Sequence, residues 1–465
     1  MTKLSGLTVG LRGLLVAYAV ILLIAILSTP LWLAEILQVA ASIQASLAVL
    51  ISWMVITPGA APIFFFTQFP LVTLFGHSPL VARLPTLFFA LASCYVFCRI
   101  AQQIPLQQPL LATCLFVLVP IHYRFATIGV AAEEALFFLL LATLFFIRLV
   151  ETGAIRDAIL YSVFLTLCLY TEAFSYLPAV GYLLGLLVFV NRKEVRRTIW
   201  ISLPATAAPI LLFLPFVLWA HPFTAKAWLY ESGRFAFGPS AYLAAFRELS
   251  ATGRAGYLLS SLLLAGALVG GWRAIKLPEP MMLKRVRFIC LLGGVVSTIA
   301  LALIIDGTSS GFFSAEQIFW ALPGLVVLVS ATLDWLSSTR KLPIIASALA
   351  VLLVLISIGG DIENYTTRPY DIANATRLIA PQLTGDSCVV FVSESLSKTI
   401  FTVFDLHLGD RECLNFFHKR IVLASHPFVR PDQQEDAESF FRGLNFTVKK
   451  RIEASGSKII VLEQH

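Results

Sequence analysis

The chain is 465 residues long; hydrophobic residues make up 58% of it, charged residues only 13%, and the mean hydropathy is +0.84. No soluble protein of this length can bury so large a share of apolar side chains, so the composition excludes a soluble globular domain and predicts a chain that lives in a bilayer. The formal net charge of +7 gives no indication of nucleic-acid binding, because Lys and Arg gather in short connectors between apolar stretches.

Apolar stretches of about 17 to 23 residues, the length that crosses the hydrocarbon core, recur along the chain. There are about eleven of them, which predicts an α-helical polytopic membrane protein. The first is too long for the core of a signal peptide, so we interpret it as a retained helix. The predicted spans lie at about residues 11–33, 81–103, 107–123, 132–149, 157–173, 175–191, 198–220, 255–272, 287–305, 313–335 and 342–359.

The distribution of Lys and Arg predicts the orientation, since positive residues near helix ends stay in the cytoplasm. With the spans above, every basic connector falls on one side, so the N-terminus is expected in the cytoplasm and the C-terminal part outside it. The connectors carry Lys3 and Arg12; Arg148 and Arg156; Arg192, Lys193, Arg196 and Arg197; Arg273, Lys276, Lys284, Arg285 and Arg287; and Arg340 and Lys341.

Two outer segments interrupt the membrane part, which we expect to occupy residues 1–360. The segment at about 34–80 is too polar and too rich in proline to span, and its apolar patches, Ile43–Ile56 and Ile63–Leu74, have the length of helices lying along the membrane surface. The segment at about 221–254 is rich in aromatic and charged residues. These segments are where a lid or a substrate platform could be built.

Residues 361–465 change character and predict a small extracytoplasmic α/β domain. Strands are expected in GDSCVVFVSES and SKIIVLEQ, and amphipathic helices in RPYDIANATRLIAPQL and DAESFFRGL. Cys388 and Cys413 lie on the predicted oxidising side, where they either form a disulfide or remain two buried thiols.

No Walker loop, HExxH or CxxC motif is present, so the candidates for chemistry are the carboxylates at the predicted outer edge of the membrane. Glu133 and Asp306 stand among small or polar residues and are expected, on balance, to be solvated. Glu35, Glu172 and Glu316 stand among apolar residues, which favours burial over a solvated face; whether each lines a cavity is left open by the sequence. Converging carboxylates of this kind suit the deprotonation of an acceptor hydroxyl beside a lipid-borne substrate.

The order of these features resembles bacterial members of glycosyltransferase family 39, in the GT-C superfamily, which includes protein O-mannosyltransferases and the aminoarabinose and galacturonic acid transferases of lipid A. The resemblance covers nearly the whole chain, although each motif alone is weak. It is carried by PLWLAEILQVAAS, in which Glu35 matches the second member of the family's Asp-Glu pair; by TLFGHSPLVARLPTLFFALA; by VPIHYRFATIGVAAEEALFFLLLATLFF; by FWALPGLVVLVSATL; and by the tail RPYDIANATRLIAPQLTGDSCVVF.

The resemblance implies a fold, a location and a reaction. It implies a GT-C-like enzyme of the bacterial inner membrane that transfers a sugar, with inversion, from an isoprenoid-phosphate donor to a glycan, lipid or protein acceptor outside the cytoplasm. A carboxylate would be the base, with Glu35 first by position and Glu133 and Glu172 as the others. Cations for the leaving phosphate would be Arg83, Arg124, Lys226 and Arg234, and further cavity-lining residues would be Glu134, His221, Glu316 and Gln317.

Some of these residues also have simpler interpretations. Arg83 has the position of a helix-end residue that snorkels to the membrane surface, and Lys226 and Arg234 have the setting of ordinary loop charges. Carboxylates and phosphate together suit Mg²⁺ or Mn²⁺, yet no ligand spacing in the sequence specifies a metal site.

The chain departs from the family's pattern at its outer loop. Ala34 stands where the family has the Asp that usually acts as base. Glu172 occupies a position where relatives often have His, and Gln317 lies near a position where relatives often have Arg. Either the site is rearranged, or the fold is kept without the transfer. A carrier or flippase for a lipid-linked sugar and a non-catalytic partner of another transferase are the alternative functions; against a carrier, the chain lacks a convincing internal repeat.

Overall fold

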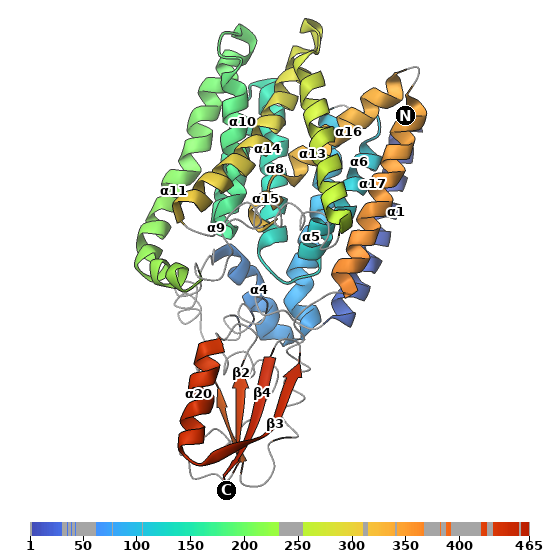
Figure 1. Cartoon of the computed structure of the whole chain (residues 1–465). Coiled ribbons are helices and arrows are strands. Elements are labelled where there is room, and N and C mark those ends of the chain that lie inside the picture. Colours follow the sequence, from blue (N-terminus) through green and yellow to red (C-terminus); the bar gives the residue numbers. More distant parts are fainter. Residues whose placement is uncertain are drawn as a thin grey trace. The chain divides into compact units, whose positions relative to one another are not determined.

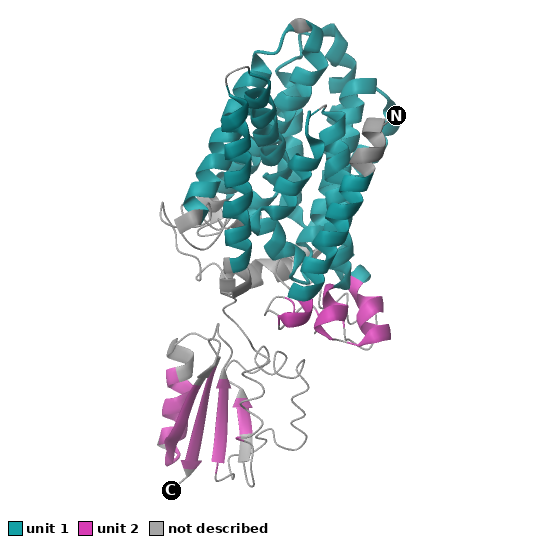
Figure 2. Cartoon of the chain, turned by 90° about the vertical axis from the view of Figure 1, so that its right-hand side faces the viewer, with its two compact units in different colours: residues 1–25, 51–67, 84–366 teal, residues 26–50, 68–83, 367–465 magenta. Residues whose placement is uncertain are grey.

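The structure is a computed structural model. It describes residues 2–29, 35, 39, 42, 62–76, 78–104, 106–231, 254–309, 315–339, 342–366, 382, 387–391, 420–425, 431–454 and 457–464. The chain divides into two compact units, residues 1–25, 51–67 and 84–366 in the first and residues 26–50, 68–83 and 367–465 in the second (Figure 2). We refer to the first as the helical unit. The expected domain boundary at residues 360 and 361 stays a prediction.

Helices make up most of the described membrane part, and each predicted span overlaps at least one of them (Figure 1). They are α1 (Thr2–Ser28), α4 (Pro62–Phe75), α5 (Pro79–Gln103), α6 (Pro109–Leu118), α7 (Pro120–Ala126), α8 (Ala132–Thr152), α9 (Ile155–Thr171), α10 (Leu177–Leu187), α11 (Lys193–Glu231), α13 (Arg254–Ile275), α14 (Met282–Ser309), α15 (Ala315–Phe319), α16 (Leu322–Ser338) and α17 (Pro343–Thr366), with short 3-10 helices at Ala173–Tyr176 and Glu279–Met281.

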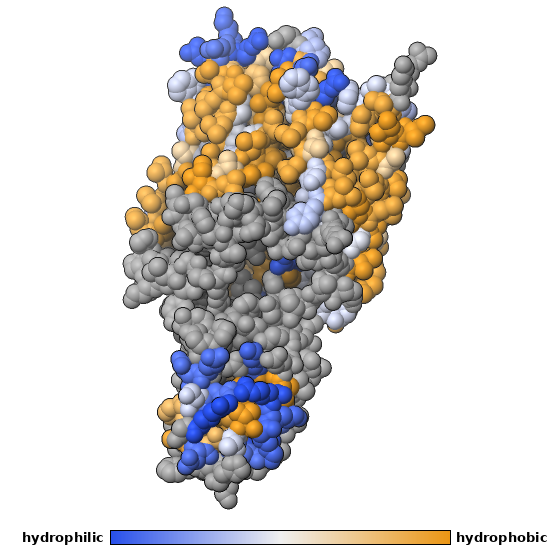
Figure 3. Space-filling model, in the orientation of Figure 1, coloured by the Kyte–Doolittle hydropathy of each residue, from blue (hydrophilic) through white to orange (hydrophobic). Residues whose placement is uncertain are grey.

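Among the described residues, seven helices are long and apolar enough to cross a membrane, or eight if the bent pair α6 and α7 forms one span. Large apolar side chains remain exposed on these helices, for example Val16 on α1 (65% exposed), Leu211 on α11 (68%) and Ile344 on α17 (82%). Such side chains suit lipid and not water, and they form the broad apolar belt seen in Figure 3. The chain is therefore an integral membrane protein, while the count of eleven crossings stays a prediction.

The span expected at residues 107–123 is broken. Helices α6 and α7 meet at an angle of 67°. Pro120 explains the break, because proline lacks the N–H that would continue the helix and disfavours helical torsion angles in the residue before it. Accordingly, Val119 is extended, with φ −65° and ψ 124°. After the break, α7 begins at Pro120, so that His122 lies in the first turn of a new helix.

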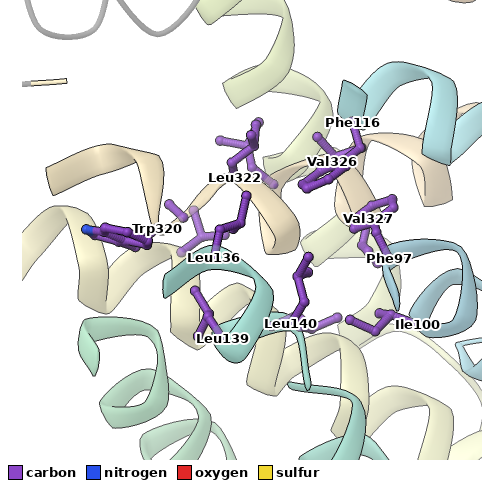
Figure 4. Packing of buried hydrophobic residues seen from close by; sticks show 14 of the residues in the cluster. Phe97, Ile100, Phe116, Leu136, Leu139, Leu140, Trp320, Leu322, Val326 and Val327 are labelled. Atoms are coloured by element: carbon purple, nitrogen blue, oxygen red, sulfur yellow. The ribbon is translucent and has the colours of Figure 1, made fainter. Parts of the chain in front are cut away.

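The core of the helical unit takes aliphatic and aromatic side chains from most of its helices, and side chains of α5, α6, α8 and α16 meet within it. Phe97 and Phe116 stack with ring centres 4.2 Å apart and an interplanar angle of 6°. Figure 4 shows how side chains from these helices interdigitate at the centre of the cluster, with the labelled residues Phe97, Ile100, Phe116, Leu136, Leu139, Leu140, Trp320, Leu322, Val326 and Val327.

Helices α10 and α14 approach so closely that only glycine fits between them. A Cβ atom on Gly181 would lie 2.0 Å from the carbonyl oxygen of Gly293, and a Cβ on Gly293 would lie 2.3 Å from the carbonyl oxygen of Gly181. Small residues that let helix backbones meet are a common basis of helix association in membranes, where the hydrophobic effect does not drive packing.

Polar contacts join several helix ends at one end of the helical unit. Arg287 at the start of α14 donates to the carbonyl oxygen of Gln103 (2.7 Å) and pairs with Glu151 at the end of α8 (3.2 Å). The backbone N–H of Gln107 donates to the carboxylate of Asp334 near the end of α16 (2.6 Å). We call this end the basic end, because the connections α10–α11 and α13–α14 also lie there, and Figure 3 shows hydrophilic residues gathered at it.

The C-terminal part contains a four-stranded sheet of order β1-β2-β4-β3. Strand β1 (Ser387–Phe391) is parallel to β2 (Arg420–Ser425), and β4 (Ser457–Gln464) is antiparallel to both β2 and β3 (Phe446–Ala454). Helix α20 (Pro431–Gly443) packs Phe441 into a small core with Phe446 and Ile460. The expected α/β character is confirmed, and DAESFFRGL and SKIIVLEQ form the helix and the strand predicted for them.

Two expectations differ from the structure or lie outside it. Helix α11 continues to Glu231, so the first part of the segment expected to be an outer loop at 221–254 is helical, and residues 232–253 lie outside the described residues. The surface helix expected at Ile63–Leu74 corresponds to α4, whereas Ile43–Ile56 lies outside the described residues.

Candidate functional site

Glu35 and Arg83 form a fully buried, bidentate ion pair. Arg83 Nε lies 2.5 Å from Glu35 Oε1, and Nη2 lies 2.7 Å from Oε2; both side chains are 0% exposed. This fork geometry is the strongest arrangement open to a guanidinium and a carboxylate, because two parallel charge-assisted hydrogen bonds form at once. Glu35 therefore has both carboxylate oxygens engaged by one arginine.

The remaining terminal nitrogen of Arg83 closes the end of helix α1. Nη1 donates to the carbonyl oxygens of Ile26 (3.1 Å) and Thr29 (2.9 Å) and to the hydroxyl oxygen of Thr29 (3.0 Å). The last carbonyls of a helix lack partners within the helix and carry the negative end of its dipole, so a cation is stabilising there. Arg83 is fully buried, so it does not snorkel to the membrane surface.

A second polar cluster lies inside the helical unit, where α1, α7 and α8 meet. The hydroxyl of Tyr18 lies 2.9 Å from His122 Nδ1, and His122 Nε2 lies 3.7 Å from Glu133 Oε2. His122 and Glu133 are both 0% exposed, and the His122 ring centre lies 4.5 Å from that of Phe116. We call these three residues the Tyr18–His122–Glu133 cluster.

Glu133 is buried without hydrogen bonds, contrary to the expectation that it would be solvated. Among the described residues, neither of its carboxylate oxygens has a hydrogen-bond partner. Its place in the first turn of α8 explains part of this, since the helix N-terminus favours a carboxylate electrostatically. A buried carboxylate that no donor satisfies is costly, and such groups in natural proteins call for an explanation by an absent ligand or by catalysis.

Glu134, the next residue, is also buried and has one polar partner. The hydroxyl of Thr67 in α4 lies 3.1 Å from Glu134 Oε2 and 2.8 Å from the carbonyl oxygen of Phe64. Glu134 Oε1 has no hydrogen-bond partner among the described residues. Two adjacent carboxylates thus lie inside the helical unit at the start of α8.

Three more expected site residues lie at this end of the helical unit, opposite the basic end. Arg124 is half-buried in the last turn of α7. Glu172 is half-buried where α9 ends, and its carbonyl accepts a hydrogen bond from the hydroxyl of Ser175 (2.6 Å). Gln317 in α15 is buried, and the neighbouring Phe319 lies with its ring centre 4.7 Å from that of Phe125 in α7.

Other predicted residues cannot be placed as side chains. His221 and Lys226 lie in α11 and Glu316 lies in α15, but their side chains are outside the described residues. Ala34, Arg234, Asp306 and the pair Cys388 and Cys413 fall outside them as well, in side chain or entirely. Within the described residues, no three His, Cys, Asp or Glu side chains gather as they would around a metal ion.

His122 lies in a segment that carries the family resemblance but was not predicted as a site residue. Tyr18 and Thr67 were not predicted either. The signal was present for two of them. Tyr18 and His122 are polar side chains within or beside predicted spans, and a polar group at membrane depth is expected to have a partner. Thr67 carries no such signal, because a threonine can bond its own helix backbone anywhere.

Comparisons with known proteins place the fold. No family model and no curated protein matches the sequence. Among solved structures, the chain is similar to ArnT from Cupriavidus metallidurans bound to undecaprenyl phosphate, with 13% identity, a TM-score of 0.55 and coverage of 97% of each chain. It is also similar to the same protein in the apo state, with 13% identity, a TM-score of 0.57 and coverage of 98% of each. The GT-C-like fold that the sequence resemblance implied is therefore confirmed over nearly the whole chain.

Proposed function

We propose that the protein is a membrane glycosyltransferase that transfers a sugar from an isoprenoid-phosphate donor to an acceptor outside the cytoplasm. The fold supports this, since the similar ArnT was solved with undecaprenyl phosphate, which is an isoprenoid phosphate. The observation that carries the proposal is Glu133, a buried carboxylate with both oxygens unpartnered among the described residues, beside His122. A site that keeps such a group at membrane depth has a use for it.

We assign Glu133, and not Glu35, as the base. The bidentate contact with Arg83 engages both oxygens of Glu35, so that carboxylate is poorly placed to accept a proton from a substrate. With Tyr18 as donor to His122 Nδ1, the neutral imidazole carries its proton on Nε2, facing Glu133. This arrangement would orient Glu133 without neutralising it.

The proposed step is a single displacement. The acceptor hydroxyl oxygen forms a bond to the anomeric carbon, Glu133 takes the hydroxyl proton, and the bond from the anomeric carbon to the phosphate oxygen breaks, with its electron pair leaving on the isoprenoid phosphate. Inversion follows from attack on the face opposite the leaving group. Arg124 lies two residues after His122 on the same helix, and we assign it to stabilise the negative charge of the leaving phosphate.

The test is transfer of a labelled sugar from polyprenyl-phosphate donors by the purified full-length protein. Glu133→Gln keeps the shape of the side chain and removes the base, so transfer should fall by roughly 10²–10⁴-fold, the usual contribution of a general base. Glu194→Gln, an exposed change at the start of α11, is the matched control and should transfer normally.

Two outcomes would contradict the proposal. Undiminished transfer by Glu133→Gln would move the base to another group, with Glu172 next. No transfer by the wild-type protein from any polyprenyl-phosphate sugar would favour a carrier or an accessory partner. Adding a chelator to the same assay tests whether Mg²⁺ or Mn²⁺ takes part; the described carboxylates do not gather a ligand set for it.

A further inference from the structure

A polar pocket lies at the basic end of the helical unit, away from Glu133 and Glu134. It has a volume of about 300 Å³ and lies between the ends of α13, α14 and α16 and the α5–α6 connection. Its polar lining includes Gln107, Arg273, Lys276, Lys284 and Asp334, and its apolar lining includes Phe288 and Trp335. We call it the α13–α14 pocket.

Aromatic rings, and not carboxylates, hold two of its cations. The guanidinium carbon of Arg273 lies 3.7 Å from the ring centre of Trp335, and Lys276 Nζ lies 4.2 Å from that of Trp272. A cation on a ring face is attracted by the ring quadrupole but keeps its N–H donors free for other acceptors. Within the described residues, neither cation forms an ion pair.

The third cation and the single carboxylate complete the charge of the pocket. Lys284 at the start of α14 is half-buried, with Nζ 5.9 Å from the ring centre of Phe288. Asp334 is the one acidic lining residue, and its carboxylate already accepts the backbone N–H of Gln107 (2.6 Å). Three cations against one carboxylate leave the pocket with an excess positive charge of two, which suits an anion such as a phosphodiester.

The surroundings of the pocket are those of a membrane surface. Trp272 (57% exposed) and Ile275 (51% exposed) alternate in sequence with the lining residues Arg273 and Lys276 and present apolar side chains from the last turns of α13, a helix long and apolar enough to cross a bilayer. Tryptophan is enriched where hydrocarbon meets the headgroups. The same connector is the one whose Lys and Arg content predicts a cytoplasmic location.

We infer that the α13–α14 pocket binds the phosphate headgroup of an anionic membrane phospholipid, with the acyl chains lying against the exposed apolar residues of α13. Basic pockets between helices on the cytoplasmic side commonly receive such headgroups. A free phosphate ion offers the same charge, but the flanking apolar surface would contribute nothing to its binding. The inference is independent of the proposed transfer reaction.

The experiment uses the full-length protein in mild detergent, titrated with a short-chain phosphatidylglycerol and separately with the matching phosphatidylcholine and with inorganic phosphate. Binding is followed by native mass spectrometry. Phosphatidylglycerol should bind at least tenfold tighter than phosphatidylcholine, and Arg273→Gln/Lys284→Gln should weaken it by roughly tenfold or more. Lys193→Gln/Arg196→Gln removes two exposed cations from another basic connector and should bind as wild type.

A second variant keeps the inference testable if the double variant misfolds. Asp334→Asn retains an acceptor for Gln107 and removes the negative charge, so it should tighten phosphatidylglycerol binding several-fold. Equal binding of the two lipids, unchanged affinity in both pocket variants, or inorganic phosphate binding as tightly as phosphatidylglycerol would each overturn the assignment.

Discussion

Arg83 and Glu35 show how a residue with the signature of a functional site can be needed for folding. Each is costly to bury alone, and the pair is tolerated because each of the three guanidinium nitrogens donates to an acceptor. From sequence alone, an arginine near a helix end is as well suited to binding a phosphate as to forming an ion pair, and a carboxylate in the first outer loop is as well suited to binding a hydroxyl. Only the fold brings residues 48 positions apart into one fork.

Removing one partner of this pair should cost far more than removing both. Glu35→Gln and Arg83→Gln should each lower the free energy of unfolding by about 3–5 kcal/mol, because each leaves the other partner buried with poor compensation. The double variant should lose clearly less than the sum. Thermal midpoints in mild detergent measure the three losses.

The control for this cycle is Lys449→Gln, in an exposed pair with Glu463 in the sheet, where a change below about 1 kcal/mol is expected. Strictly additive midpoints in the Glu35 and Arg83 cycle would show that the two side chains are not coupled.

Residue types also limited what could be predicted about the candidate site. Glu133 stands among small residues, which argues for a solvated turn, yet it is fully buried with His122 of α7 next to it. Burial of this kind depends on long-range packing, which periodicity in one segment does not encode. Tyr18 and His122 are 104 positions apart, so their hydrogen bond could not be read from either segment.

At the scale of elements, apolar length predicted the helices well and their breaks poorly. The stretch at 107–123 satisfies the length criterion, but Pro120 divides it, and the LPG sequence at 322–324 begins α16 after a break from α15. Proline rules predict such sites, whereas hydropathy averages across them. In the C-terminal part, β3 mixes charged with apolar residues, and β2 is a short apolar run after a single Arg, which periodicity alone does not distinguish from part of a buried helix, so neither strand was predicted.

The contact between α10 and α14 provides a test at this scale. Gly293→Ala should push the two helices apart and lower the thermal midpoint strongly. The new methyl group would clash with the carbonyl oxygen of Gly181, and a backbone atom cannot move aside by changing rotamer as a side chain does. Gly359→Ala in α17 is the matched control, since its Cβ would meet nothing within 4 Å. It should be neutral or slightly stabilising, as alanine is the better helix former by about 1 kcal/mol. Equal midpoints for the two variants would mean that α10 and α14 are not in close contact.

For the whole molecule, the sequence predicts sidedness from charge alone, and the structure adds that the α10–α11 and α13–α14 connections share one end of the helical unit. Reporter fusions within the α10–α11 and α13–α14 connections should therefore be active only as cytoplasmic reporters, and a fusion after His465 only as an extracytoplasmic one. A cytoplasmic readout at the C-terminus would contradict the orientation on which the outer acceptor depends.

The contacts of Arg287 with Gln103 and Glu151, and of Gln107 with Asp334, have a mechanical consequence. They join α5, α8 and α14 to one another, and the α5–α6 connection to α16, at the basic end. We therefore expect these helices to move apart less at the basic end than at the opposite end, as levers do about a hinge.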